Sequence, residues 1–238
     1  MQVSMDCNRS KPNFGIKNFK PRNILSQDEL KLLNEFKKQY NYADTKSLQW
    51  KTKRILDVGL SIIGAVLSAP IMLLSALAVK LTSKGPLLFK QERIGKDGDT
   101  FIIYKLRTMK KNADPHTNVQ DADDERVTKV GKFLRKYSLD ELPQFYNIIK
   151  GDMSLSGPRA IPVKDHAIRK QNDAFVMRYV FKPGASLDCG ETAMQHFVDN
   201  NPEASNIAEQ EYVKNWNLKK DFITYYKTLR RMVLGYNC

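Results

Sequence analysis

The chain has 238 residues and a formal net charge of +13, because 39 Lys and Arg residues face only 26 Asp and Glu residues. A chain of this length can bury a real core, as one large domain or two small ones. Its charge calls for an anionic partner: nucleic acid, an acidic membrane surface or a phosphorylated substrate. The few, widely spaced cysteines exclude a disulfide framework and a zinc spacing, and indicate reduced cytoplasmic thiols: Cys7, Cys189 and Cys238.

Residues 1–50 are predicted to form a cytoplasmic arm that contains one short helix. They are polar and contain no apolar core, so we expect no signal peptide here. Residues 1–24 are typical of a poorly ordered segment. Ser26-Gln27-Asp28-Glu29 matches a capping box, and apolar residues follow it at helical spacing: Leu30, Leu33, Phe36 and Tyr40. We expect this helix only to pack or to contact a partner.

Residues 51–84 are predicted to form a membrane helix. From Gly59 to Val79 no residue is charged, and as a helix this length covers roughly 30 Å, the thickness of the bilayer hydrocarbon. The break at Ala69-Pro70 lies near the middle and predicts a kink. Lysines and arginines lie on both sides, which favours both ends in the cytoplasm. A re-entrant helix satisfies both observations, and an ordinary kinked span with the remainder outside is the alternative.

A short β-hairpin is predicted next. The runs 87–91 and 101–106 are β-like, and Gly95-Lys96-Asp97-Gly98 between them is a hairpin signal. Lys105 and Arg107 are two residues apart, so on a strand they would point the same way and could clamp a diphosphate. A solvated basic edge explains the same spacing.

Two basic amphipathic helices are predicted further along the chain. In each, an apolar stripe alternates with Lys and Arg, over residues 126–137 and 219–233. Either helix alone could simply pack on a core. Beside an intramembrane segment, the pattern favours helices that lie in the headgroup region of an anionic membrane.

The adjacent carboxylates of Asp140 and Glu141 are the strongest candidates for chemistry. Ser138-Leu139-Asp140-Glu141 also fits a capping box, so a purely structural role as a helix start remains open. Pro143 is better placed if Asp140 is the cap. An ionised aspartate held beside Arg135 can attack phosphorus or bind magnesium. The sequence shows no P-loop, Rossmann glycine pattern, Ser/His/Asp set or zinc-ligand spacing.

Several of these stretches, in this order, resemble the bacterial sugar transferase family, the monotopic phosphoglycosyl transferases that prime glycan assembly on undecaprenyl phosphate. The resemblance runs from about Lys53 to Leu229. It rests on motifs distributed along the chain: Lys53-Arg54-Ile55-Leu56-Asp57, Gly85-Pro86, Phe89-Lys90-Gln91-Glu92-Arg93-Ile94-Gly95, Tyr104-Lys105-Leu106-Arg107-Thr108-Met109, Ser138-Leu139-Asp140-Glu141-Leu142-Pro143-Gln144, Asn147, Lys150-Gly151-Asp152-Met153-Ser154 and Gly157-Pro158-Arg159.

The resemblance implies a two-step transfer of a sugar 1-phosphate from a UDP-sugar to undecaprenyl phosphate, with release of UMP. Asp140 would form a covalent phosphosugar-aspartyl intermediate and bind Mg²⁺, with Mn²⁺ as an alternative, while Glu141 would activate or orient the lipid phosphate. The remaining matched positions are implied to bind substrate: Lys105, Arg107, Arg135, Gln144, Pro158 and Arg159. The product would prime an exopolysaccharide, capsule, O-antigen or glycoprotein glycan.

The chain departs from the family pattern at four places. Ala69-Pro70 replaces Ser-Pro at the helix break, and Pro158-Arg159-Ala160 replaces Pro-Arg-Pro. Residues 185–190 differ from the family loop, and Glu209 replaces a usual aspartate. These changes keep a second hypothesis open, a catalytically reduced membrane scaffold of a glycan-assembly complex. A nucleic-acid binder explains the charge but not the apolar segment.

The predicted fold class is α+β and mostly helical. A re-entrant membrane helix, interfacial amphipathic helices and a small β-hairpin would form a compact catalytic domain that faces the cytoplasm from the bacterial inner membrane. Residues 51–238 would be the sugar transferase domain, with 85–238 as its catalytic and interfacial region. The expected partners are a UDP-sugar, undecaprenyl phosphate and anionic lipids but no nucleic acid, and a homo-oligomer is compatible with this scheme.

Overall fold

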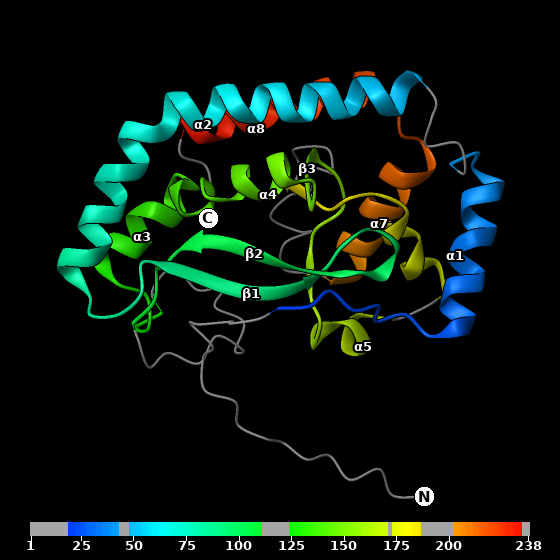
Figure 1. The fold of residues 1–238 in the computed structure, drawn as a ribbon, viewed down its shortest axis with the longest axis horizontal. Coiled ribbons are helices and arrows are strands. Elements are labelled where there is room, and N and C mark those ends of the chain that lie inside the picture. The colour runs from blue at the N-terminus through cyan, green and yellow to red at the C-terminus, as the bar shows by residue number, and fades with distance from the viewer. Residues whose placement is uncertain (1–18, 43–47, 111–123, 171–172, 187–201, 235–238) are drawn as a thin grey trace, which may run out of the picture.

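The computed structural model describes residues 19–42, 48–110, 124–170, 173–186 and 202–234. Helices dominate these segments, around two small sheets (Figure 1). The elements are, in chain order, α1 (Gln27–Gln39), α2 (Leu48–Thr82), β1 (Leu88–Ile94), η1 (Lys96–Gly98), β2 (Thr100–Leu106), α3 (Lys129–Lys136), η2 (Leu139–Glu141), α4 (Gln144–Lys150), β3 (Ser154–Ser156), β4 (Ile161–Pro162), α5 (Asp165–Arg169), η3 (Asp173–Val180), β5 (Gly184–Ser186), α7 (Pro202–Lys214) and α8 (Leu218–Leu234). The α+β, mostly helical class is confirmed.

Helix α1 starts at the predicted capping box. The Ser26 hydroxyl accepts a hydrogen bond from the Glu29 amide, and the Glu29 carboxylate accepts one from the Ser26 amide. Leu33 is 1% exposed and joins a core that also contains residues of η3 and α7. Residues 19–42 therefore share a hydrophobic core with the region that follows α2, although the sequence pattern divides the chain at residue 50.

Helix α2 is long and unusually exposed for an apolar helix. It begins at Leu48 and ends at Thr82, close to the predicted range 51–84, and Pro70 lies in its interior. Figure 1 shows that the helix bends partway along its length. Of the described helices it is the one long and apolar enough to cross a membrane, and 11% of its most apolar window is buried in the protein. Exposed leucine and isoleucine side chains on this scale are typical of a membrane or protein interaction surface.

The predicted hairpin is confirmed. Strands β1 and β2 pair antiparallel, with Leu88 opposite Leu106 and Ile94 opposite Thr100. The first strand reaches Ile94, three residues beyond the predicted end. In the turn, Asp97 and Gly98 both have positive φ, at 60° and 85°, which is the conformation that an Asp-Gly turn provides. β4 pairs with the other edge of β1, and β3 and β5 form a separate parallel pair.

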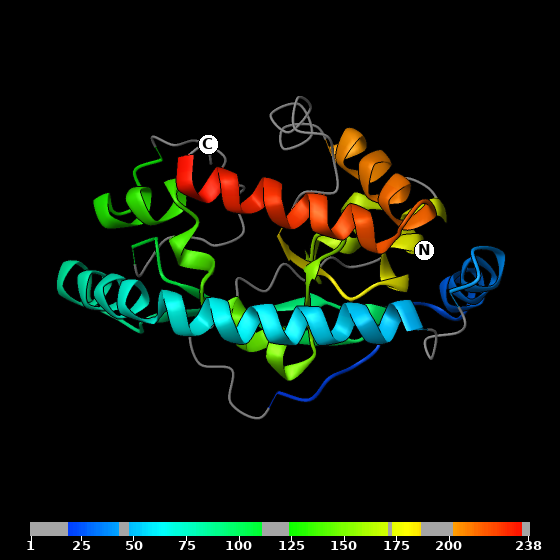
Figure 2. The same ribbon diagram turned by 90° about the horizontal axis from the view of Figure 1, so that it is seen from above.

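The two predicted amphipathic helices are present as α3 and α8. Figures 1 and 2 both show α8 running alongside α2. Apolar side chains remain exposed on both helices, including Phe133 on α3 and Phe222 and Tyr226 on α8. Another side of each helix is buried, through Leu134 and Asp221 respectively. Each helix therefore keeps one apolar surface outside the protein core.

Candidate active site

The acidic pair lies in η2, next to the end of strand β2. Asp140 is 8% exposed, while the Glu141 side chain is 26% exposed and contacts the Lys105 ammonium in an ion pair. Lys105 is the penultimate residue of β2, so the hairpin delivers this cation to the dyad. The structure thus brings together three residues that the sequence assigned to chemistry.

The predicted capping role of this stretch is wrong in both of its forms. Ser138 has φ 52° and its side chain caps nothing in η2, and α4 begins at Gln144 with Pro143 before it and no side-chain cap. The reason lies upstream, because Tyr137 ends α3 and Ser138 must turn the chain in the left-handed region. The carboxylates are therefore not occupied by capping bonds to a following helix.

Burial gives Asp140 its chemical character. Burial raises the pKa of the Asp140 carboxyl above its ordinary value, and the neighbouring charge of Glu141 raises it further. Lys105 and Arg135 act in the opposite direction, because their positive charges favour the ionised form. A carboxylate with a raised pKa is more basic, and hence more nucleophilic, than a solvated one.

Glu141 responds to the same surroundings in the opposite way. Burial pushes its pKa up, but Lys105, Arg159 and Arg93 together hold the pKa below the ordinary glutamate value. Glu141 is thus the ionised, paired member of the dyad, and Asp140 is the more basic one. Arg93, on β1, belongs to a quoted motif but received no predicted role, and only the folded hairpin reveals its place beside Glu141.

Arg135 is anchored against the end of β2. Its Nε donates to Thr108 Oγ1 over 3.0 Å. Gly131 on the same helix permits this approach, since a Cβ there would lie 2.0 Å from the Thr108 carbonyl oxygen. Helix α3 therefore packs backbone against backbone on the segment that follows Lys105, which fixes Arg135 near Asp140.

Helix α4 follows the dyad and is held from two sides. Asn147 is fully buried, donates from Nδ2 to the Ile102 carbonyl at 2.6 Å and accepts at Oδ1 from the Tyr104 amide at 3.2 Å. Arg54 of α2 donates to the last carbonyls of α4, at 2.8 and 3.0 Å. Gln144, a predicted substrate contact, is 3% exposed in the first turn of this helix.

The Pro158-Arg159 turn contributes another guanidinium, whose charge acts on Glu141. The Arg159 side chain is exposed, while its amide donates to Glu209 Oε1 at 3.1 Å and its carbonyl accepts from Arg178 at 3.2 Å. Arg178 and Glu209 form a buried ion pair behind the turn. Glu209, which departs from the family pattern, thus supports the backbone at Arg159. The altered loop is described only as far as Ser186, and residues 187–190 lie outside the described residues.

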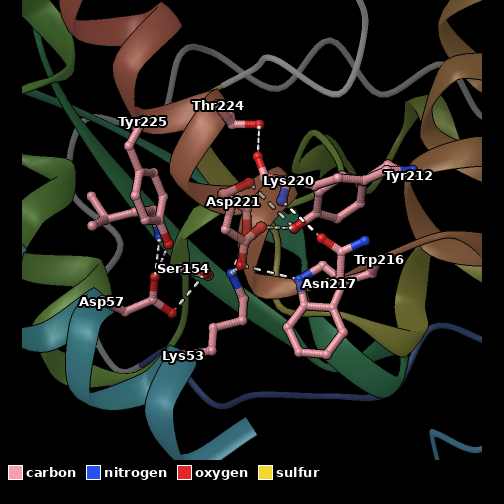
Figure 3. A network of polar contacts seen from close by, with 12 residues as sticks. Lys53, Asp57, Ser154, Tyr212, Trp216, Asn217, Lys220, Asp221, Thr224 and Tyr225 are labelled. Carbon is pink, nitrogen blue, oxygen red and sulfur yellow. Dashed lines mark hydrogen bonds and ion pairs between the residues drawn. The ribbon is translucent and has the colours of Figure 1, made fainter. Parts of the chain in front are cut away.

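A buried polar network fixes the strand that leads into this turn (Figure 3). Asp57 on α2 accepts hydrogen bonds from Ser154 Oγ at 2.7 Å, the Leu155 amide at 3.0 Å and Tyr225 at 3.3 Å. One turn earlier, Lys53 pairs with Asp221 of α8 at 2.7 Å. The start of the apolar helix, β3 and α8 are therefore tied together just before Gly157, which sequence reasoning did not foresee.

Arg107 lies apart from the dyad. Its Nη2 donates to the Ser83 carbonyl at 2.7 Å and the Ser83 hydroxyl at 2.6 Å, at the end of α2. Lys105 and Arg107 therefore contact different partners in this structure, and the diphosphate clamp stays a prediction. A role for Arg107 in binding substrate stays a prediction.

The dyad fits a magnesium ion only if the substrate supplies ligands. Within the described residues, no group of three or more His, Cys, Asp or Glu side chains could hold a metal. Asp140 nevertheless offers one hard carboxylate, and Mg²⁺ is often bound by one or two carboxylates together with substrate phosphates and water. Asp140 with a diphosphate would satisfy that requirement.

Comparison with known proteins identifies the family of this chain. The family model for bacterial sugar transferases matches residues 48–235. A UDP-N-acetylgalactosamine-undecaprenyl-phosphate N-acetylgalactosaminephosphotransferase of Aeromonas hydrophila is 37% identical, over 77% of this chain and 44% of that protein. UDP-glucose:undecaprenyl-phosphate glucose-1-phosphate transferases of Caulobacter vibrioides and Escherichia coli are each 37% identical over 74% of this chain. The matches cover 68% and 39% of those two proteins. The chain spans less than half the length of several relatives, including the Aeromonas hydrophila and Escherichia coli proteins. The chain belongs to the bacterial sugar transferase family.

Proposed function

We propose that this protein is a membrane phosphoglycosyl transferase that moves a sugar 1-phosphate from a UDP-sugar to undecaprenyl phosphate and releases UMP. The names of its relatives support this reaction class. The observation that carries the proposal is the dyad itself. A buried aspartate with a raised pKa stands beside a glutamate held ionised by Lys105, and Arg135 and Arg159 lend their charges to the same site.

In the first step, an Asp140 carboxylate oxygen attacks the sugar-bearing phosphorus of the UDP-sugar. A new P–O bond to Asp140 forms as the bond from that phosphorus to the bridging oxygen breaks, and UMP leaves with that oxygen. The raised basicity of Asp140 favours the attack. Lys105, Arg135 and Arg159 supply positive charge where negative charge develops on the two phosphates.

In the second step, a phosphate oxygen of undecaprenyl phosphate attacks the same phosphorus. The P–O bond to Asp140 breaks, and the carboxylate is regenerated as the polyprenyl diphosphosugar forms. Glu141, ionised and paired with Lys105, orients the acceptor phosphate through that lysine. A magnesium ion bound by Asp140 and the diphosphate would neutralise part of the substrate charge.

The reaction requires that the dyad stand at a membrane surface. The exposed apolar face of α2 and the exposed aromatic side chains of α3 and α8 support such a position. We propose that α2 enters and leaves the cytoplasmic face of the inner membrane with its break at Ala69-Pro70, so that the catalytic region faces the cytoplasm. Reporter fusions at the two termini on opposite sides of the membrane would contradict this topology.

The reaction is tested with the full chain in micelles that contain polyprenyl phosphate and Mg²⁺. Each member of a UDP-sugar panel, including UDP-glucose and UDP-N-acetylgalactosamine, is offered with a radiolabelled sugar. We expect UMP release with at least one donor and transfer of the label to the lipid. Donor binding without UMP release across the panel would overturn the proposal in favour of the scaffold hypothesis.

A further inference from the structure

A basic hollow lies at the end of α2, apart from the dyad. It has a volume of about 560 Å³ and is formed where the end of α2 meets the start of α3. Among the described residues, three lysines and three hydroxyl groups line it and no acidic residue does: Lys84, Lys110, Lys129, Thr82, Ser83 and Thr128. Ammonium and hydroxyl donors without a competing carboxylate are the groups that bind a phosphate.

The three lysines have no acidic partner among the residues that the structure describes. Across the segments that the structure describes, none of them forms an ion pair with an Asp or Glu side chain, whereas Asp124 nearby is taken by Arg126. Their side chains are exposed. The described lining of the hollow therefore carries an excess of positive charge.

The buried guanidinium of Arg107 adds to this excess. It is 2% exposed and binds Ser83, which itself lines the hollow. No carboxylate of the described residues pairs with Arg107, and its Nε and Nη1 have no hydrogen-bond partner there. Buried charges are normally paired, because an unpaired one is costly. An external anion at the adjacent hollow would supply the missing counter-charge.

The setting of the hollow favours an anion that carries apolar chains. On the last turns of α2, Leu77 and Leu81 are 56% and 76% exposed and lead to the rim. Val127 and Val130 form apolar parts of the wall. A phosphate held by the lysines would thus have an apolar helix surface beside it for its hydrocarbon portion.

We infer that this hollow binds the phosphate headgroup of an anionic membrane phospholipid, at the point where α2 leaves the bilayer. The inference rests on the proposed membrane position of α2, but not on the transfer reaction. It assigns a specific lipid site to Lys84, Lys110 and Lys129, in addition to general attraction between the basic protein and an anionic membrane.

The test uses the detergent-solubilised full chain, with phosphatidylglycerol added to neutral micelles at increasing mole fraction. Binding is read from the lipid-dependent rise in the midpoint of thermal unfolding. The hollow variant carries Lys84→Gln, Lys110→Gln and Lys129→Gln. A matched control carries Lys38→Gln, Lys164→Gln and Lys214→Gln, which remove the same charge from exposed lysines elsewhere. A third variant replaces the three hollow lysines by Arg.

We expect the hollow variant to need at least tenfold more phosphatidylglycerol for half of the effect, while the control stays within twofold of wild type. The Arg variant should retain the wild-type lipid response, which also shows that the site tolerates substitution. Equal weakening in the hollow and control variants would overturn the inference. So would displacement of the lipid by equimolar inorganic phosphate, or by UDP, because these results would assign the hollow to a soluble phosphate or to the donor. Because binding is measured without turnover, the outcome is independent of the proposed reaction, and Asp140→Asn should bind the lipid normally.

Discussion

Two stretches of this chain have the same pattern, Ser-x-Asp-Glu, and the structure uses them differently. Residues 26–29 form a complete capping box, in which Glu29 turns back to the amide of Ser26. Residues 138–141 form no cap, and Glu141 turns to Lys105. The aspartates differ as well, because the Asp28 side chain is 93% exposed and Asp140 is 8% exposed.

The difference arises from what surrounds each pattern. Ser26 is extended, at φ −66° and ψ 165°, which is the conformation that a helix cap requires. Ser138 directly follows the end of α3 and turns the chain at φ 52°, so its hydroxyl does not cap η2. Lys105 then offers Glu141 an ion pair that the backbone cannot match. A local pattern therefore determines a cap only where neither the preceding element nor a long-range partner competes with it.

Replacement of Asp140 or of Asp28 by asparagine should give the largest difference in reaction rate between the two stretches. Asp140→Asn removes the attacking carboxylate, so UMP release should fall by roughly 10³-fold or more. Asp28→Asn should leave the rate within twofold, because its side chain lies in solvent. Both rates are measured as initial UMP release at saturating donor. A normal rate for Asp140→Asn would remove the nucleophile assignment, provided that the variant unfolds at the wild-type temperature.

Replacement of the two glutamates by glutamine should affect different quantities, the reaction rate for Glu141 and the free energy of unfolding for Glu29. Glu141→Gln weakens the interaction with Lys105 and should lower the rate by about 10²-fold, because the acceptor phosphate is then misplaced. Glu29→Gln should leave the rate unchanged but lower the free energy of unfolding by about 1.5–3 kcal/mol, since the buried Glu29 carboxylate is paired with the Lys170 ammonium. Denaturant titration in detergent measures the second quantity. A stability loss in Glu141→Gln as large as in Glu29→Gln would erase the contrast.

The contribution of Glu29 to stability should also depend on pH with a definite sign. Burial pushes its pKa up, but the Ser26 amide, Lys170, the Ser26 hydroxyl and His166 lower the pKa to about 2. The folded pKa lies below the unfolded one, so the contribution is present above about pH 4.5 and is lost as pH falls toward 2. The Gln variant should lack this acid dependence, which is followed by the unfolding midpoint between pH 5 and pH 2.

Sequence reasoning located the elements but not the contacts between them. The α1 cap, the apolar helix and the Asp-Gly hairpin follow from local patterns, since each depends on residues within one or two turns. Local patterns do not predict that Lys105 and Arg107 contact different partners. Strand β2 ends at Leu106, and Arg107 donates a hydrogen bond to Ser83 at the end of α2. The hydrogen bonds of Asp57 and Asn147 join residues that are 43 to 168 positions apart in the chain. Local sequence patterns cannot predict such contacts.

Lys105→Gln should shift the pH dependence of the reaction. Asp140 must be ionised to attack, so kcat/KM falls as pH drops through its pKa. Burial raises that pKa and Lys105 lowers it, so loss of the lysine charge raises the pKa further and moves the acid limb to higher pH. Lys150→Gln, which removes a lysine paired with Asp152 outside the dyad, should leave the limb in place. If the acid side of the kcat/KM profile moved to lower pH in Lys105→Gln, the electrostatic account of the dyad would be contradicted.

The serines should give the smallest effect and the most direct test of the two local conformations. Ser26→Ala removes a cap and should lower the free energy of unfolding by about 1 kcal/mol. Ser138→Gly should cost less than about 0.5 kcal/mol, because glycine adopts φ 52° without the steric penalty of a side chain. Denaturant titrations of both variants in the same detergent give the comparison. If Ser138→Gly lowered the free energy of unfolding more than Ser26→Ala does, the Ser138 side chain would stabilise the turn before the dyad. The two Ser-x-Asp-Glu stretches would then be more alike than their hydrogen bonds indicate.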